Sequence, residues 1–349
     1  MSNADQLARI GQDRVLILDG AMGTQIQDLK LDENGYRAER FADWPVPIQG
    51  NNDILNLTAP DAVRAIHAAY FAAGADIIET NTFSATRIAQ ADYRMEELAA
   101  EIARDGARLA REAADAAAEA TGIAKGVAGA IGPTNKTLSI SPDVNDPGYR
   151  DTNFGKVRDA YLEQARAMQP FVDFFLVETI FDTLNAKAAI KAVLDLRDET
   201  GQDVPIMISG TITDRSGRTL SGQTAEAFWY SVRHAKPWAI GLNCALGAAD
   251  MRQYIAEISR VADTRVLAYP NAGLPNDMGE YDEQPHETAS HLSDWAQSGL
   301  VNIVGGCCGT TPAHIAEIAR QARDAAPRQV RAASASMRLS GLEPFELSA

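Results

Sequence analysis

Short apolar runs alternate with longer stretches of helical patterning along most of the chain. Eight runs are almost continuously apolar, which is typical of parallel strands buried on both faces. They cover residues 15–20, 75–83, 126–133, 174–179, 206–213, 239–244, 266–272 and 302–308. Helical stretches lie between and after them, at 58–74, 95–122, 154–169, 182–200, 222–235, 248–260, 284–298 and 312–325. Eight strands with a helix after each favour a (β/α)8 TIM barrel, although a doubly wound open sheet has the same alternation.

Two parts of the chain depart from the regular alternation. Residues 25–57 form a long polar insertion after the first strand, and loops of this length usually act as lids or substrate walls. The loop at 213–222 is a second candidate wall. Residues 327–349 show neither strand nor helix periodicity. We therefore expect an α/β barrel domain over residues 1–326, and a linker or docking tail over 327–349.

Composition and charge argue against several classes of function. The 349 residues include 47 acidic and 32 basic side chains, and the resulting net charge of −15 disfavours binding to nucleic acids or anionic membranes. No run of 18 apolar residues could span a membrane, and the N-terminus lacks a secretory signal pattern. Three cysteines are too few for a disulfide scaffold. We expect a cytoplasmic protein in which clustered thiols bind a metal or take part in catalysis.

Polar residues gather where the predicted strands end. In a barrel, the carboxyl ends of all strands meet at one face, and reactive residues lie there. The residues at these ends are Asp19-Gly20, Glu79-Thr80-Asn81, Glu178-Thr179, Asn243-Cys244, Asn271 and Cys307-Cys308. All three cysteines of the chain therefore fall at one rim of the barrel.

The adjacent cysteines at 307 and 308 can face one point only if their strand has already ended, because successive strand residues point to opposite faces. We expect Gly305, Gly306 and Gly309 to permit the unusual backbone angles of such a turn. Cys244 lies two strands away around the barrel. Three thiolates that leave one tetrahedral position open are the arrangement that holds zinc for substrate binding.

Other interpretations of the cysteines stay open at this point. They could be small buried side chains without a role, a strained disulfide between Cys307 and Cys308, or a nucleophile that works with a histidine. The five histidines all fall in helical stretches, where we expect surface or packing roles. They are His67, His234, His286, His291 and His314.

Zinc held by three thiolates suits alkyl transfer better than hydrolysis, because the thiolates have already neutralised most of its charge. It can instead bind a fourth thiol as a thiolate, which attacks an alkyl carbon at neutral pH. Asp19 and Glu178 could hold the ammonium group of an amino-acid thiol, or could simply cap loops or form internal ion pairs. The segment with Gly20, Gly23 and Thr24 offers backbone N–H groups to a carboxylate. No nucleotide-binding glycine motif occurs.

Longer motifs surround these strand ends. They are LDGAMGT (18–24), ERFADW (39–44), GADIIETNTF (74–83), AGAIGPTNK (128–136), VETIFDTLNAK (177–187), SGTITDRSGRTLSGQT (209–224), GLNCALGA (241–248), YPNAGLPN (269–276) and NIVGGCCGTTPAHI (302–315). Together they resemble the homocysteine-binding module of cobalamin-dependent methionine synthase, over residues 10–342. The cysteine signature resembles the wider homocysteine S-methyltransferase family, whereas ERFADW, NCALGA and YPNAGLPN are similar to the cobalamin-dependent branch in particular.

The resemblance implies a role for each matching residue. It implies zinc ligation by Cys244, Cys307 and Cys308, and binding of the homocysteine amino group by Asp19 and Glu178. The backbone at Gly20–Thr24 would lie near the homocysteine carboxylate, and Asn271 would approach the zinc when substrate is absent.

The resemblance also implies a zinc-dependent methyl transfer to homocysteine that forms methionine. The enzyme of the family continues into folate-binding, cobalamin-binding and reactivation modules, and this chain has no predicted cobalamin or folate site. We therefore expect methylcobalamin to be carried by a separate subunit or module. The alternatives are a homocysteine methyltransferase that uses S-methylmethionine or betaine, and a non-catalytic protein that binds zinc and homocysteine.

Overall fold

The computed structural model describes residues 1–213, 216–333 and 335–347. Eight parallel strands stand side by side in the order β1-β8-β7-β6-β5-β4-β3-β2. Their bounds are β1 Leu16–Ile17, β2 Ile77–Glu79, β3 Gly126–Ile131, β4 Phe174–Ile180, β5 Ile206–Gly210, β6 Ala239–Gly247, β7 Arg265–Asn271 and β8 Ile303–Val304. A bridge between Leu18 and Ile77 joins the first strand to the second and nearly closes the ring. The prediction of a (β/α)8 barrel is confirmed, and each predicted strand overlaps an observed one.

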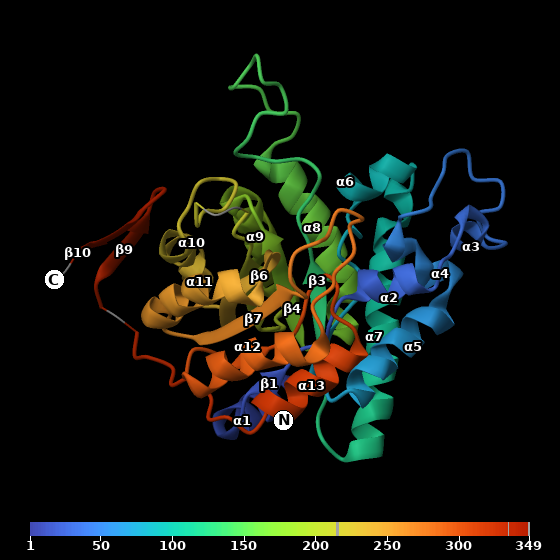
Figure 1. Cartoon of the computed structure of the whole chain (residues 1–349). Coiled ribbons are helices and arrows are strands. Elements are labelled where there is room, and N and C mark those ends of the chain that lie inside the picture. The colour runs from blue at the N-terminus through green and yellow to red at the C-terminus, as the bar shows by residue number, and fades with distance from the viewer. Residues whose placement is uncertain (214–215, 334, 348–349) are drawn as a thin grey trace.

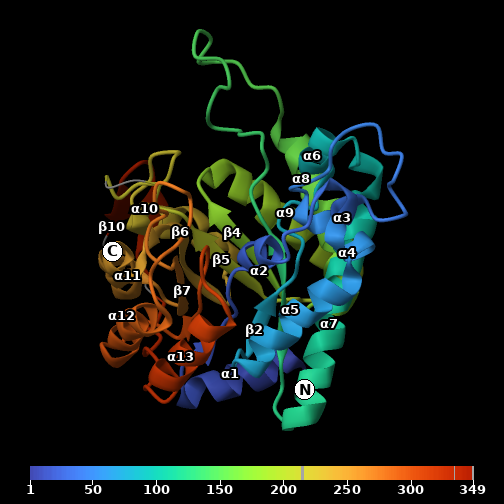
Figure 2. The same cartoon turned by 45° about the vertical axis from the view of Figure 1, so that its right-hand side comes forward.

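Helices surround the barrel (Figures 1 and 2). The helices that follow the strands are α5 Pro60–Ala72, α7 Ala99–Thr121, α8 Phe154–Met168, α9 Thr183–Thr200, α10 Ala225–Val232, α11 Ala248–Val261, α12 Pro285–Gln297 and α13 Pro312–Ala322. An additional helix, α1 (Asn3–Asp13), lies below the amino ends of the strands (Figure 1). Its Leu7 packs with Leu16, Ile77 and Phe174 inside the barrel. The apolar interior is thus closed at the amino ends, which leaves the carboxyl ends for chemistry.

The insertion after the first strand contains four short helices, with a loop over residues 38–51 between the second and the third. They are α2 Met22–Asp28, α3 Glu33–Arg37, η1 Asn52–Ile54 and α4 Leu55–Thr58. Buried amides attach this insertion to the segment after β2: Asn51 Nδ2 donates to Gln90 Oε1 at 2.8 Å, and Asn81 Nδ2 donates to the carbonyl of Asn52 at 2.9 Å. These bonds fix the insertion against the segment after β2, and its role as a wall of the site stays a prediction.

A second excursion from the barrel lies between β3 and α8, and the sequence pattern did not single it out. Residues 132–153 rise well above the carboxyl ends of the strands (Figures 1 and 2). The base of this segment is anchored because Asp182 accepts hydrogen bonds from the backbone N–H groups of Leu138 and Ser139, at 3.1 and 2.8 Å. Of the predicted wall at 213–222, residues 214 and 215 lie outside the described part of the chain.

The tail is more regular than its sequence suggests. It contains an antiparallel hairpin of β9 (Met337–Ser340) and β10 (Pro344–Leu347), although these residues show no strand periodicity in the sequence. The polar side chains of the hairpin face α10, where the guanidinium of Arg338 lies 5.1 Å from the Tyr230 ring. Strands of four residues are too short to show alternation in sequence, and contact with a helix stabilises them here.

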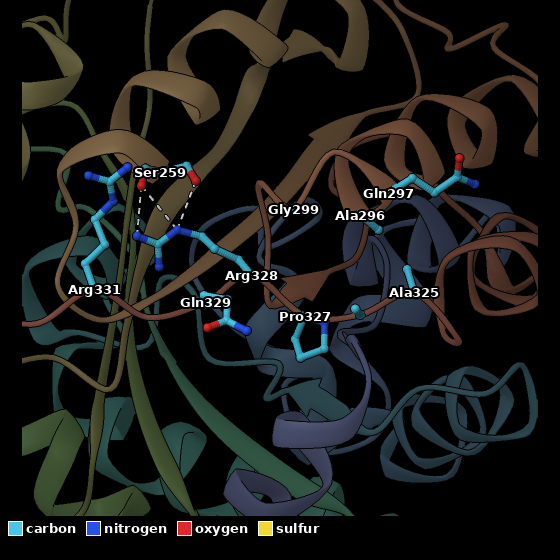
Figure 3. A pocket seen from close by; sticks show the side chains of 10 residues that line it. Ser259, Ala296, Gln297, Gly299, Ala325, Pro327, Arg328, Gln329 and Arg331 are labelled. Carbon is cyan, nitrogen blue, oxygen red and sulfur yellow. Dashed lines mark hydrogen bonds between the residues drawn. The ribbon is translucent and has the colours of Figure 1, made fainter.

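Arg328 anchors the start of the tail at the amino ends of the strands, the end opposite to the cysteines. Its guanidinium donates to the carbonyls of Ser259, Ala262 and Thr264, at 2.8, 2.6 and 2.9 Å, and also to the Ser259 hydroxyl at 2.9 Å. Figure 3 shows this arginine in a cavity between the tail and the end of α11. Every guanidinium nitrogen is used, so the group has a structural role.

None of the described helices is long and apolar enough to cross a membrane.

The buried histidine of α5 makes a testable contribution to acid stability. Burial without any hydrogen-bond partner lowers the pKa of His67 to about 3. The unfolded chain takes up a proton at this residue below about pH 6.5, whereas the folded chain does not, so stability falls as pH drops from 6.5 toward 3. Between pH 7.5 and pH 5, the free energy of unfolding of the wild type should fall by about 2 kcal/mol more than that of His67→Leu.

Urea unfolding at pH 7.5 and pH 5 measures this difference directly. His67→Leu should lose less stability between the two pH values than the wild type loses. His286→Leu, at an exposed histidine of α12, is the matched control and should behave as the wild type does. Equal pH dependence of the wild type and His67→Leu would contradict the prediction.

Candidate functional site

The three cysteines converge at the carboxyl ends of the strands. Their sulfur atoms all lie within 4.8 Å of one another, and Cys244 Sγ is 3.8 Å from Cys308 Sγ. All three thiols are free, and each residue is partly exposed at the barrel mouth. Within the described residues, this is the one group of three or more Cys, His, Asp or Glu side chains whose spacing could hold a metal ion. The predicted convergence of Cys244, Cys307 and Cys308 is therefore observed.

The adjacent cysteines lie in a turn, as their shared orientation requires. Strand β8 ends at Val304, and the turn is tied to the end of β7 on both sides. The backbone N–H of Cys307 donates to the carbonyl of Pro270 at 2.8 Å, and the carbonyl of Cys308 accepts from the N–H of Ala272 at 2.9 Å. The neighbouring strand thus fixes the direction of both thiols.

The glycines around these cysteines act in two different ways. Gly309 has a φ of +81°, in the left-handed region that favours glycine. Gly305 and Gly306 do not, so the prediction that all three supply unusual backbone angles is wrong for these two. They permit close approach instead: a Cβ at Gly305 would lie 2.8 Å from the Asp19 carbonyl oxygen, and one at Gly306 would overlap the Thr310 side chain.

Cys244 reaches the cluster through a strained segment of β6. Cys244 and Ala245 have φ values of +59° and +57°, and the pairing with β7 shifts register between Asn243 and Gly247. At the end of β4, Thr179 has a φ of +53°. Such conformations cost about 1–3 kcal/mol each in residues other than glycine, and they cluster at functional sites.

Three carboxyl groups interact with one another at the strand ends, and Glu178 also interacts electrostatically with Cys308. Asp19 and Glu178 are 3% and 4% exposed, and Asp19 Oδ2 accepts from the backbone N–H of Glu79 at 3.0 Å. Glu79 contributes its own carboxyl, one oxygen of which is buried without a partner. Its position at a strand end marked Glu79 in the sequence, but it was not among the predicted site residues. None of the three carboxyls forms an ion pair within the described residues.

Burial makes these carboxyls hard to ionise in the absence of a cation. It raises the pKa of Glu178 to about 8. The pKa values of Asp19 and Glu79 are also raised, first by burial and then by the negative charge of Glu178. A positively charged group placed among them would be favourable, because it would stabilise the ionised forms. An ammonium group fits this requirement, although the binding roles of Asp19 and Glu178 stay predictions.

The glycine-flanked segment after β1 borders the same mouth. Thr24 Oγ1 accepts from the backbone N–H of Gly309 at 3.0 Å, so its side chain braces the cysteine turn. Gly20 is tightly packed, since a Cβ there would lie 2.8 Å from Thr310 Oγ1, whereas the nearest atom to a Cβ at Gly23 is 3.7 Å away. The first N–H groups of a helix have no acceptor within it, which leaves those of α2 for another acceptor. Carboxylate binding by Gly20, Gly23 and Thr24 stays a prediction.

Asn271 ends β7 beside the cysteine turn. It is 2% exposed, and its Oδ1 is buried without a hydrogen-bond partner. A buried acceptor without a partner is unfavourable, so a metal ion or a donor from substrate would stabilise it. This observation is compatible with the predicted approach of Asn271 to a metal, which itself stays a prediction.

Two further residues at the cluster were not among the predicted site residues. Asn243 is fully buried, and its Nδ2 lies 3.9 Å from Cys307 Sγ. Tyr281, in the loop after β7, packs so closely on Gly309 that a Cβ there would overlap its side chain. The position of Asn243 before Cys244 could have indicated its role. No pattern in the loop indicated Tyr281.

Of the three thiols, only that of Cys308 has a lowered pKa, and the other two have raised pKa values. Hydrogen bonds from Cys244 and Cys307, with a smaller contribution from Tyr281, lower the pKa of Cys308 to about 3. The pKa of Cys307 is raised because its neighbours bond to its protonated form, and that of Cys244 is raised to about 11. A metal ion would replace the protons that the other two thiols retain.

The histidines lie away from this cluster, as predicted. His67 belongs to α5, His234 to η5 (Arg233–Ala235), His286 and His291 to α12, and His314 to α13. No histidine joins the thiols in the described part of the chain. This disfavours a cysteine nucleophile activated by histidine.

Comparison with known proteins gives a family match and a similarity of fold. A model of the homocysteine S-methyltransferase family matches residues 16–322. The chain belongs to this family. The metallated crystal form of the homocysteine methyltransferase MmuM from Escherichia coli is similar in fold, with a TM-score of 0.69 and 21% identity over 91% of this chain and 99% of MmuM. Its apo form gives a TM-score of 0.65 at 20% identity, over 92% of this chain and 100% of MmuM.

Removal of one thiol tests whether the cluster holds a metal. Cys307→Ala should reduce bound metal from about one ion per chain to less than a tenth of that, because two sulfurs leave the ion poorly enclosed. Elemental analysis after dialysis measures the content. Met278→Ser removes an exposed sulfur from the nearby loop and is the matched control. Full metal retention by Cys307→Ala would rule out the cluster as the binding site.

Proposed function

We propose that this chain is a zinc-dependent homocysteine S-methyltransferase that accepts a methyl group from methylcobalamin carried on a separate folate- and cobalamin-binding subunit or module, and so forms methionine. Membership in the homocysteine S-methyltransferase family supports the class of reaction. The single observation that carries the proposal is the spacing of the three partly exposed sulfurs at the strand ends that also carry buried carboxyls.

The sulfur spacing fits zinc. A Zn–S bond is about 2.3 Å long, so two sulfurs on a tetrahedral zinc lie about 3.8 Å apart. The distance between Cys244 Sγ and Cys308 Sγ is 3.8 Å. Soft sulfur donors select zinc over magnesium or calcium. Cys244, Cys307 and Cys308 would therefore hold the ion and leave a fourth position for substrate.

The chain itself binds and orients the amino acid. Zinc, when bound, supplies a site at which the homocysteine sulfur is held as a nucleophilic thiolate at neutral pH. Asp19 and Glu178 bind the ammonium group, which lets both carboxyls stay ionised in spite of their burial. The N–H groups between Gly20 and Thr24 bind the carboxylate. These contacts hold the end of homocysteine that carries the ammonium and carboxylate groups. They therefore orient its sulfur toward the mouth, where the methyl donor arrives.

The choice of methylcobalamin rests on three stretches that resemble the cobalamin-dependent branch. ERFADW at 39–44 belongs to the insertion, NCALGA includes Cys244, and YPNAGLPN includes Asn271. Two of the three thus carry residues of the site itself. The walls formed by the insertion and the segment 132–153 would guide a large donor protein to the mouth. We propose a cytoplasmic location, because free thiols of this kind persist under reducing conditions.

A smaller methyl donor is the second candidate. The barrel matches 99% of the length of MmuM, a homocysteine methyltransferase, without requiring any further module. S-methylmethionine or betaine could enter an open mouth directly. A non-catalytic protein that binds zinc and homocysteine would have the same site and no turnover.

Separate assays with each donor decide between these functions. Zinc-loaded protein and homocysteine are mixed with methylcobalamin, S-methylmethionine or betaine, and methionine is measured. We expect methylcobalamin to give a rate at least tenfold above either small donor. Comparable or faster turnover with a small donor would overturn the cobalamin assignment. Homocysteine binding without turnover by any donor would indicate the non-catalytic alternative.

A further inference from the structure

A continuous chain of hydrogen bonds joins one predicted ammonium ligand to one predicted metal ligand. Thr179 Oγ1 donates to Glu178 Oε2 at 3.3 Å. Asn243 Nδ2 donates to Thr179 Oγ1 at 2.8 Å, and it also lies 3.9 Å from Cys307 Sγ, as a donor to that sulfur. This series of hydrogen bonds thus runs from the end of β4, through β6, to the turn after β8.

One backbone group determines which partner donates in every hydrogen bond of this series. The N–H of Thr179 can only donate, and it donates to Asn243 Oδ1 at 3.1 Å. The Ser209 hydroxyl donates to the same oxygen at 2.7 Å. The amide NH2 group of Asn243 must therefore face Thr179 Oγ1 and Cys307. Since Thr179 Oγ1 accepts from that amide, its single proton is left for Glu178.

The local backbone brings the members of this chain together. Thr179 and Cys244 both have positive φ values, +53° and +59°, on either side of the Asn243 amide. Asn243 is 0% exposed, and all four hydrogen-bonding positions of its amide are used. A fully satisfied buried network of this kind holds its members in one arrangement.

We propose that Thr179 and Asn243 are positioning residues that fix Glu178 relative to the cysteine cluster. They thereby select thiols whose ammonium group lies as far from the sulfur as it does in homocysteine. This inference rests on the proposed function, in which one end of the substrate binds the carboxyls and the other end binds at the sulfurs. A bond that orients Glu178 strengthens only ligands that use Glu178. A thiol without an ammonium group gains nothing from it.

Two ligands and one near-isosteric substitution test this. Thr179→Val removes the hydroxyl and keeps the branched shape. Calorimetric titration of the zinc-loaded protein compares L-homocysteine with 4-mercaptobutanoate, which is the same molecule without its amino group. We expect Thr179→Val to weaken homocysteine binding about tenfold, the usual size for a hydrogen bond to a charged group, and 4-mercaptobutanoate binding less than twofold.

Two further variants separate positioning from general damage. Thr179→Ser restores the hydroxyl and should bring homocysteine affinity within about threefold of the wild type. Thr211→Val is the matched control: its hydroxyl also bonds to Asn243, but at the backbone carbonyl, 3.0 Å away, outside the chain to Glu178. It should leave the ratio of the two affinities unchanged. Zinc content, measured for each variant, should stay at one ion per chain.

The possible results are distinct. Equal weakening of both ligands by Thr179→Val, or no weakening of either, would overturn the positioning role. A loss of selectivity in Thr211→Val as large as that in Thr179→Val would also overturn it. Failure of the wild type to bind either thiol would instead contradict the proposed function.

Discussion

The mouth of this barrel gathers groups that become negative when they ionise. Asp19, Glu79 and Glu178 lie at the carboxyl ends of their strands, as the three cysteines do, and no cationic side chain pairs with these carboxyls in the described residues. Burial of such groups is unfavourable unless positive charge arrives from outside the chain. In the proposed function, a metal ion on the sulfurs and an ammonium group on the carboxyls supply that charge. Substrate binding and the stability of the site are therefore coupled.

The fold creates this concentration of charge through its strand ends. Parallel strands in a nearly closed ring bring β1, β2, β4, β6 and β8 to a common mouth, although their residues are far apart in sequence. The apolar interior and α1 close the other end. At the mouth, Thr179, Cys244 and Ala245 adopt positive φ values that ordinary strands do not use. Local backbone preference gives way there to the orientation of functional side chains, which is the expected place for such conflicts.

Much of this arrangement could be predicted from the sequence. Buried strands read as continuous apolar runs, and the rule that strand ends converge placed Asp19, Glu178 and the cysteines together. The roles of Gly305 and Gly306 were misjudged because close approach and positive φ both require glycine, and the sequence does not distinguish them. The hairpin of the tail and the position of Tyr281 depend on contacts with distant elements. Short segments carry no periodic signal of such contacts.

The central claim is that the three cysteines hold zinc with one position open to the substrate thiol. X-ray absorption at the zinc edge, with and without L-homocysteine, tests it most directly. We predict three sulfur ligands and one nitrogen or oxygen ligand in the free protein, and four sulfur ligands after homocysteine is added. A zinc environment that homocysteine leaves unchanged would contradict the claim.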